Sequence, residues 1–163
     1  MNENMGHITI RPYKAGEASY VSYLQMKFYE RAYGFKGIFE HYLLASMAEF
    51  TAFPDGGRLW VALDGDNIIG SIAIVNAGDT ATQLRWFIVG ERYQGKGVGG
   101  KLMDTAMCFC KEQGYHHIIL WTIEMLDAAR RLYERYGFKL VDKKLNTEWT
   151  NRPLTEERWD LFL

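Results

Sequence analysis

The order of apolar and polar positions along the chain changes period once, near residue 90. Upstream, alternating or apolar runs predict strands, and two segments with helical spacing follow the first of them. The predicted strands are residues 7–13, 58–63, 68–75 and 81–89, and the predicted helices are residues 17–30 and 38–50. Short turns at 64–67 and 76–79 join the last three strands, which favours an antiparallel meander.

Downstream of residue 90, helical and strand patterns alternate. The predicted helices are residues 99–110, a pattern that stops at Gly114, and residues 126–136, which stops at Gly137. The predicted strands are residues 117–122, 139–145 and 158–163. The sequence therefore predicts an α/β (α+β) fold, with a mixed sheet of about six to seven strands and about four flanking helices. The sheet begins antiparallel and becomes partly parallel.

Composition and charge narrow the class of protein. The 163 residues contain 48% hydrophobic and 24% charged residues, which fits one globular domain over residues 1–163. A net charge of −1 lacks the excess of positive charge that is typical of proteins that bind nucleic acid or an anionic membrane. No apolar run approaches the ~20 residues that span a bilayer. The N-terminal MNENMGHITIRPY lacks the pattern of a secretory signal, so we expect a cytoplasmic protein.

The two cysteines, Cys108 and Cys110, lie two residues apart in a predicted helix. Side chains at that spacing point away from each other. We therefore expect two buried thiols rather than a disulfide or a metal pair, and we predict no metal site. Free thiols also fit a reducing cytoplasm.

The segment ERYQGKGVGGKLMD, residues 91–104, places four glycines between Gly95 and Gly100, where a helix begins. Free backbone amides at a helix N-terminus, together with the helix dipole, favour a bound anion such as a phosphate. Gln94 and Lys96 could add a hydrogen bond and a positive charge. The alternative is a flexible loop that only joins a strand to a helix.

Three phosphate-binding patterns compete for this segment. The P-loop pattern fails, because no Gly-Lys-Ser/Thr follows at the required spacing. A Rossmann GxGxxG pattern is met by Gly95, Gly97 and Gly100, but residues 90–94 separate the first glycine from the strand. The third pattern, Gln/Arg-x-x-Gly-x-Gly/Ala, is met by Gln94, Gly97 and Gly99.

With the third pattern, the chain resembles the acyl-CoA-binding half of the GNAT acetyltransferase family. A second segment typical of that family, AARRLYERYGF at residues 128–138, follows at the usual distance. The resemblance extends over roughly residues 7–145 and implies acetyl-CoA as the cofactor. It also implies that the strand before the glycine segment splays from a parallel neighbour, so that pantetheine fits between them. The cofactor-binding positions that it implies are Phe87, Ile88, Val89, Gln94, Gly95, Lys96, Gly97, Val98, Gly99, Gly100, Lys101, Leu126, Ala129 and Tyr133.

The resemblance also implies catalytic roles. Tyr133 matches the family tyrosine that protonates the departing thiolate, although on pattern alone it belongs to an apolar stripe typical of a core. Many relatives carry Asn where this chain has Leu126, which removes one expected cofactor contact. The splayed strand offers no carboxylate before Glu91. We therefore expect a water relay to remove the amine proton, with Glu91 as the candidate side chain and Glu124, at the end of the next strand, as the alternative.

The acceptor is expected to be the primary amine of a small molecule, an amino acid or a protein. Aromatic residues at Tyr29, Tyr33, Phe35 and Trp149 are the candidate contacts, and a helix-face core is the alternative interpretation. The function predicted is an acetyl-CoA-dependent N-acetyltransferase that acts by direct transfer in a ternary complex. A catalytically weak acyl-CoA-binding or sensing module is the alternative.

Three segments show a closer resemblance, to the acetyltransferase half of bacterial chains that fuse a MarR-type DNA-binding domain to GNAT. They are KFYERAYGFKGIFEHYLLASMAEF, LRWFIVGERYQGKGVGGKL and ILWTIEMLDAARRLYERYGFKLV. No basic patch accompanies them here, so no DNA binding is predicted. The C-terminal ERWDLFL is expected to be an edge strand that completes the sheet or pairs with a second chain in a homodimer.

Overall fold

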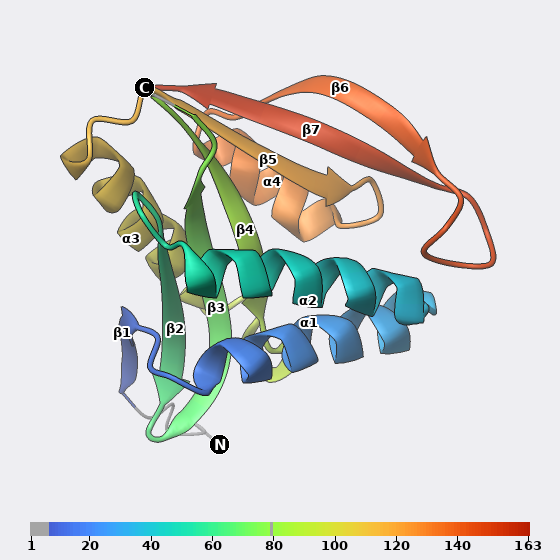
Figure 1. The fold of residues 1–163 in the computed structure, drawn as a ribbon, viewed down its shortest axis with the longest axis horizontal. Coiled ribbons are helices and arrows are strands. Elements are labelled where there is room, and N and C mark those ends of the chain that lie inside the picture. Colours follow the sequence, from blue (N-terminus) through green and yellow to red (C-terminus); the bar gives the residue numbers. More distant parts are fainter. Residues whose placement is uncertain (1–6, 79) are drawn as a thin grey trace.

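The computed structural model describes residues 7–78 and 80–163 and forms one mixed seven-stranded sheet with helices on both faces (Figure 1). The sheet order is β1-β2-β3-β4-β5-β7-β6. The strands are β1 (Ile8–Pro12), β2 (Arg58–Asp64), β3 (Asn67–Asn76), β4 (Ala81–Val89), β5 (His117–Ile123), β6 (Lys139–Asn146) and β7 (Leu154–Phe162). The helices are α1 (Glu17–Tyr33), α2 (Gly37–Ala52), α3 (Val98–Glu112) and α4 (Asp127–Arg135), with a short 3₁₀ turn η1 (Glu91–Tyr93) after β4.

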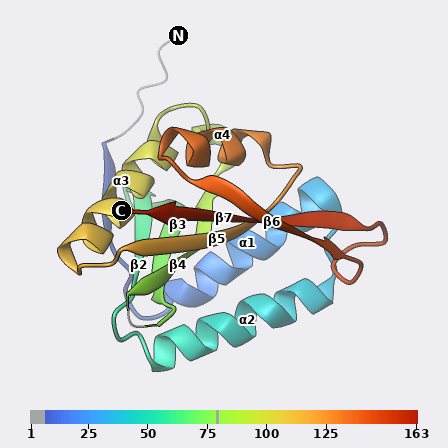
Figure 2. The same ribbon diagram turned by 90° about the horizontal axis from the view of Figure 1, so that it is seen from above.

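The sheet separates two hydrophobic cores. Figures 1 and 2 show α1 and α2 on one face and α3 and α4 on the other. In strand β2, successive side chains point to opposite faces of the sheet and therefore enter both cores. Trp60 and Ala62 pack toward α3, whereas Leu59, Val61 and Leu63 pack toward α1 and α2.

The predicted fold class is confirmed. Strands β1 to β4 pair antiparallel in sequence order, and β4 then pairs parallel with β5. The observed helices and strands match the predicted ones in number and order, and β4 has the predicted bounds. The predicted turn at 76–79 includes position 79, which lies outside the described residues. Residues 1–6 of the segment MNENMGHITIRPY, on which the leader prediction rests, lie outside them too. Across the described ranges, no helix is long and apolar enough to span a bilayer.

The prediction of an edge strand at the C-terminus was wrong. Strand β7 lies inside the sheet, with β5 on one side and β6 on the other. It is also longer than predicted, because it begins at Leu154. Its first half carries Glu156 and Glu157, whose charges hid the strand pattern although both side chains are buried. The edges of the sheet are β1 and β6.

The prediction of two buried thiols was half wrong. Cys110 packs in the core, where burial raises the pKa of its thiol to about 12. Cys108 is exposed, and its Sγ lies 3.4 Å from Oε1 of Glu112. The helical spacing that separates the two side chains also sends one of them to solvent.

Candidate functional site

Strands β4 and β5 pair at one end only. Ala81–Gln83 pair with His117–Ile119, and beyond them the described residues of the two strands form no further pairs. Strand β5 instead stays with β7 along its whole length. Figure 1 shows β4 and β5 diverging from their shared end. The second half of β4 therefore presents one open edge of backbone groups, which require a hydrogen-bonding partner.

A β-bulge bends β4 where this gap opens. The register with β3 shifts between Ser71 and Ala73, and Trp86 has a φ of 45°, in the left-handed region. The Ser71 hydroxyl, which is fully buried, donates to the Trp86 carbonyl oxygen at 2.6 Å. A non-glycine residue in this conformation stores strain, and such strain concentrates at functional sites.

The glycine segment after β4 forms the entry to α3. Gly95 and Gly97 have φ values of 72° and 83°, and Gly97 is the N-cap of the helix. A Cβ on either would meet nothing within 4 Å, so the backbone conformation, and not packing, requires glycine there. Within the described structure, Tyr93 N–H and Gln94 N–H donate to Gly90 O and Glu91 O, and the next amide with a backbone acceptor is Lys101 N–H, which donates to Gly97 O at 3.1 Å. The six preceding amides, residues 95–100, remain available to an anion.

A cavity of about 650 Å³ joins the open edge of β4, the glycine segment, the start of α4 and one face of α1. This size lies within the ordinary range of small-molecule sites. The sequence-predicted residues that line it are Phe87, Ile88, Val89, Gln94, Gly95, Gly97, Gly99, Gly100, Leu126, Ala129, Tyr29 and Tyr33. The structure therefore brings most of the predicted cofactor positions together with two of the predicted acceptor positions.

Several predicted cofactor residues act differently from expectation or lie apart from this cavity. Gln94 donates its side-chain amide to Val89 O at 3.0 Å, so it fixes the turn after β4. Val98 is buried in the core at the start of α3. Among the residues described, Lys96 and Lys101 are exposed and do not line the cavity, and the ammonium of Lys96 lies 6.0 Å from the ring centroid of Tyr93.

Two arginines that the sequence analysis missed supply positive charge to the cavity. Arg131 and Arg135, one helical turn apart on α4, both line it and both are exposed. Their i, i+4 spacing within AARRLYERYGF was the signal that could have revealed them. Phe28 of α1 is a further lining residue that the sequence analysis left out.

Tyr133 stands on α4 beneath the gap, among aromatic rings. The centroid distances from its ring are 6.3 Å to Phe87 of β4 and 6.4 Å to Trp159 of β7. Burial, and then the charge of Tyr29 on the opposite face, raise the pKa of Tyr133 well above its usual value, so its hydroxyl stays protonated at neutral pH. In the described structure the Tyr133 hydroxyl has no hydrogen-bond partner, and its oxygen is not completely buried. It is therefore a free donor whose ring lies near Phe87 of β4, although Tyr133 is not among the described residues that line the cavity.

The predicted acceptor aromatics divide into two groups. Tyr29 and Tyr33 line the cavity, whereas Phe35, 3% exposed, packs against Trp149 with centroids 5.7 Å apart. The Lys36 amide donates to Trp149 O at 2.8 Å, which ties the loop between α1 and α2 to the loop between β6 and β7. Phe35 and Trp149 thus form part of the wall behind the site, in the second hydrophobic core.

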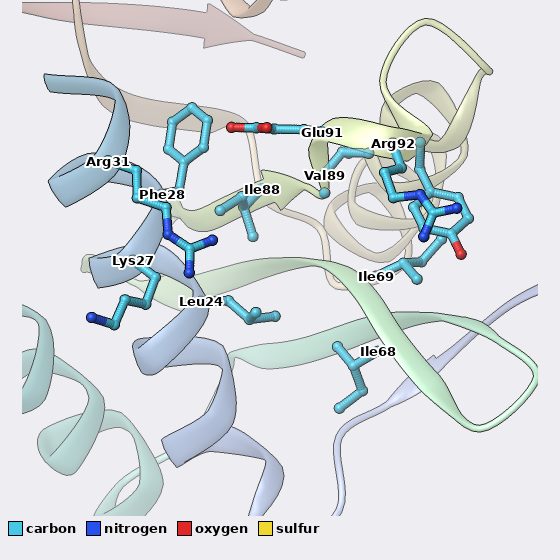
Figure 3. A pocket seen from close by; sticks show the side chains of 12 residues that line it. Leu24, Lys27, Phe28, Arg31, Ile68, Ile69, Ile88, Val89, Glu91 and Arg92 are labelled. Atoms are coloured by element: carbon cyan, nitrogen blue, oxygen red, sulfur yellow. The ribbon is translucent and has the colours of Figure 1, made fainter.

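Glu91 lies in a second cavity, of about 370 Å³, between α1 and the ends of β3 and β4 (Figure 3). Phe28, Ile88, Val89 and Tyr93 line both cavities, so the two adjoin at the end of β4. Two ligands, one in each cavity, can therefore meet at the end of β4.

Comparisons with known proteins agree on one family. The model of the acetyltransferase (GNAT) family matches residues 18–138. Rat N-acetylaspartate synthetase is 29% identical over 100 residues, which cover 61% of this chain and 33% of that protein. Rat N-acetyltransferase 8F1 is 29% identical over 96 residues, which cover 56% of this chain and 43% of that protein. The chain thus matches about a third to a half of the length of these curated relatives.

Solved structures share the fold. A GNAT acetyltransferase from Staphylococcus aureus Mu50 superposes with a TM-score of 0.79 at 20% identity, covering 96% of this chain and 99% of that one. The yncA protein of Salmonella typhimurium, solved with its cofactor acetyl-CoA, gives a TM-score of 0.74 at 16% identity, covering 96% and 94%. The family match spans most of the fold described above, and so the chain belongs to the acetyltransferase (GNAT) family.

Proposed function

We propose that the chain is an acetyl-CoA-dependent N-acetyltransferase that acetylates a primary amine by direct transfer in a ternary complex. The observation that carries the proposal is the gap between β4 and β5, which leads onto a glycine segment with six available amides. The names of the rat relatives, which are N-acetylating enzymes, and the acetyl-CoA bound to the Salmonella protein support it.

The residues around the first cavity fit acetyl-CoA. The amides of residues 95–100 suit a pyrophosphate, because they are unpaired donors at a helix N-terminus. Arg131 and Arg135 add positive charge for phosphates. The open edge of β4, residues 87–89, offers backbone groups to the amides of pantetheine, and Leu126 and Ala129 give the cavity an apolar side.

The chemistry requires a neutral amine and a protonated leaving group. When bound, acetyl-CoA supplies a thioester: the amine nitrogen bonds to the acetyl carbon, the carbon–sulfur bond breaks, and an amide and the free thiol result. We assign Glu91, through water, to the removal of the ammonium proton. Tyr133 holds a protonated hydroxyl, and we assign it to the thiolate. The second proton of the amine replaces the one that Tyr133 gives up.

Calorimetric titration with acetyl-CoA, beside NAD and ATP, tests the proposal. We expect micromolar-range acetyl-CoA binding and weaker binding of the other two. Gly97→Val should reduce the affinity for acetyl-CoA by at least about tenfold, because the left-handed conformation costs a branched residue about 1–2 kcal/mol and the backbone therefore moves away from the conformation that presents the amides. Gly114→Val is the matched control, since Gly114 has a φ of 75°, an equally open surrounding and a place at the far end of α3. A preference for NAD would overturn the proposal.

An acyl-CoA-binding module with little catalysis is a second candidate. Leu126, which lines the cavity where many relatives have an amide, is the observation that favours it. A sensor would bind acetyl-CoA but gain nothing from the Tyr133 hydroxyl. Replacement of that hydroxyl therefore separates the two candidates.

Two finer assignments are also proposals. We propose that residues 1–163 act as one acetyltransferase unit, because every strand of the described chain belongs to one sheet. We also propose kinship with the acetyltransferase half of MarR-type fusions, on the three segments quoted above. A family tree from aligned acetyltransferase sequences tests the second assignment.

A further inference from the structure

The second cavity, under α1, is lined by more positive than negative charge. Lys27, Arg31 and Arg92 bring three cationic side chains, and Glu91 is the one acid among the described residues that line it. Such a balance repels an acceptor that carries only positive charge, such as a polyamine. It favours an acceptor that carries an anionic group beside its amine.

The three cations differ in what they face. The Lys27 ammonium is paired with Glu30 Oε2 at 3.0 Å, and Figure 3 shows it pointing away from Ile88. Arg92 lies at the opposite end of the cavity from α1. Arg31 has no ion pair among the described residues, and its guanidinium points into the cavity toward Ile88. Arg92 likewise has no ion pair among the described residues, so Arg31 is the unpaired cation on the α1 side of the cavity.

The floor of the cavity is apolar. It is lined by Leu24 and Phe28 of α1, Ile68 and Ile69 of β3, and Ile88 of β4. Its volume of about 370 Å³ lies near the lower end of the ~300–1,000 Å³ typical of small-molecule sites. The cavity therefore suits a small molecule with an apolar body rather than a folded or extended protein segment.

We propose that this cavity binds a free amino acid with an apolar side chain as the acetyl acceptor, an inference that rests on the acetyltransferase activity proposed above. The carboxylate of the amino acid pairs with the Arg31 guanidinium, whose fork of donors matches a carboxylate. Its amino group faces Glu91, which Figure 3 shows reaching from the end of β4 toward Phe28. Its side chain lies on the apolar floor, next to Ile88, which also lines the cofactor cavity.

Arg31 has a second role that the test must separate from this one. It lies in the last turn of α1, where a cation stabilises the helix dipole. Lys111 occupies the same place in the last turn of α3 and lies outside both cavities, as far as the described chain shows. Lys111→Gln is therefore the matched control, because it removes a helix-terminal charge without touching the site.

The experiment compares amino acids with their decarboxylated amines as acceptors. L-phenylalanine is paired with phenethylamine and L-leucine with isoamylamine, and release of the CoA thiol is followed for the wild-type protein, Arg31→Gln and Lys111→Gln. We expect kcat/KM to be at least about tenfold higher for each acid, as one charged hydrogen-bonded pair provides. Arg31→Gln should remove that preference through KM, and Lys111→Gln should keep it.

Equal use of acid and amine by the wild-type protein, or a loss in Arg31→Gln that is the same for both, would overturn the inference and leave the proposed function standing. If no acceptor is acetylated although acetyl-CoA binds, titration of L-phenylalanine and L-leucine into the CoA-loaded protein decides. Binding that Arg31→Gln abolishes supports the site, and no binding overturns it. Absence of acetyl-CoA binding instead removes the proposed function, and the inference with it.

Discussion

The hydroxyl of Ser71 on β3 holds the carbonyl oxygen of Trp86 on β4 at 2.6 Å, at the bulge where β4 begins to leave β5. Trp86 is the non-glycine residue of the described chain with a positive φ, 45°. A buried serine thus fixes the backbone conformation from which the open edge of β4 starts. The strained backbone of Trp86 therefore lies at the candidate site, and the hydrogen bond from Ser71 maintains it.

Replacement of Ser71 tests this relationship. Ser71→Ala leaves a buried carbonyl without its donor, so we expect the free energy of unfolding to fall by about 1–3 kcal/mol, with a weaker affinity for acetyl-CoA. Urea denaturation and calorimetry measure the two effects. Thr82→Val is the control, because Thr82 makes a similar bond to Val75 O at 2.8 Å at the paired end of β4. It should lose similar stability and keep its affinity; if both variants lose affinity equally, the bulge has no special role.

Tyr133→Phe separates an enzyme from a binding module. The hydroxyl has no partner among the described residues, so its removal should change the free energy of unfolding by less than about 1 kcal/mol. If Tyr133 is the proton donor, kcat should fall by roughly 10²-fold while the calorimetric affinity for acetyl-CoA stays the same. A variant with unchanged kcat would remove Tyr133 from the mechanism and favour the sensing candidate.

The arginine pair on α4 should contribute to cofactor affinity by charge. Arg131→Gln and Arg135→Gln should each weaken acetyl-CoA binding by about 2–10-fold, and the loss should shrink as salt rises, because exposed charges are screened. Arg152→Gln is the control, since Arg152 is exposed in the loop before β7. Calorimetry at low and high ionic strength measures the difference. A loss that does not depend on salt would contradict a charge-based role.

The helices and strands could be predicted from the sequence because nearly all of them show the apolar spacing of a helix or a strand. Glycines in the adjoining turns mark where many of them begin or end. The glycine segment was predictable for the same reason, since Gly95 and Gly97 need the left-handed region. The bulge at Trp86 was not predictable, because tryptophan has no preference for that conformation and a register shift leaves no local pattern. The place of β7 was missed because Glu157, fully buried beside Arg130, looks like a surface residue in the sequence.

The sequence predicted the backbone positions of the candidate site better than the side chains that line it. Positions along β4 and the glycine segment follow from local geometry, and the structure brings them to one cavity. Arg31 and Arg131 come from helices on opposite faces of the sheet, and only the tertiary fold brings them near β4. Phe35 and Trp149 carry the same aromatic signal as Tyr29 and Tyr33, but packing places the first two in the wall.

A buried carboxylate on β7 should make the fold sensitive to acid. Asp160 is 7% exposed, and its Oδ2 lies 2.6 Å from His117 Nε2. Its two carboxylate oxygens also accept hydrogen bonds from the Arg158 guanidinium at 2.8 and 2.9 Å. Burial alone would raise the pKa of Asp160, but the bonds from Arg158 and His117 outweigh it and hold the pKa below its usual value. The ionised form therefore stabilises the folded state above the unfolded-state pKa of about 3.9, and this contribution is lost as pH falls through the lower, folded-state pKa.

Asp160→Asn should consequently unfold at lower urea concentration than the wild-type protein at pH 5 and above, because the ionised partner of Arg158 is missing. The difference in the free energy of unfolding should narrow as pH falls below about 4, where the wild-type carboxylate takes up its proton. Asp66→Asn, in the exposed turn between β2 and β3, is the control and should give no such pH dependence. Urea denaturation at a series of pH values between 5 and 2.5 measures both variants. A difference for Asp160→Asn that stays constant, or widens, toward low pH would show that the carboxylate contributes through its shape and packing rather than through its charge.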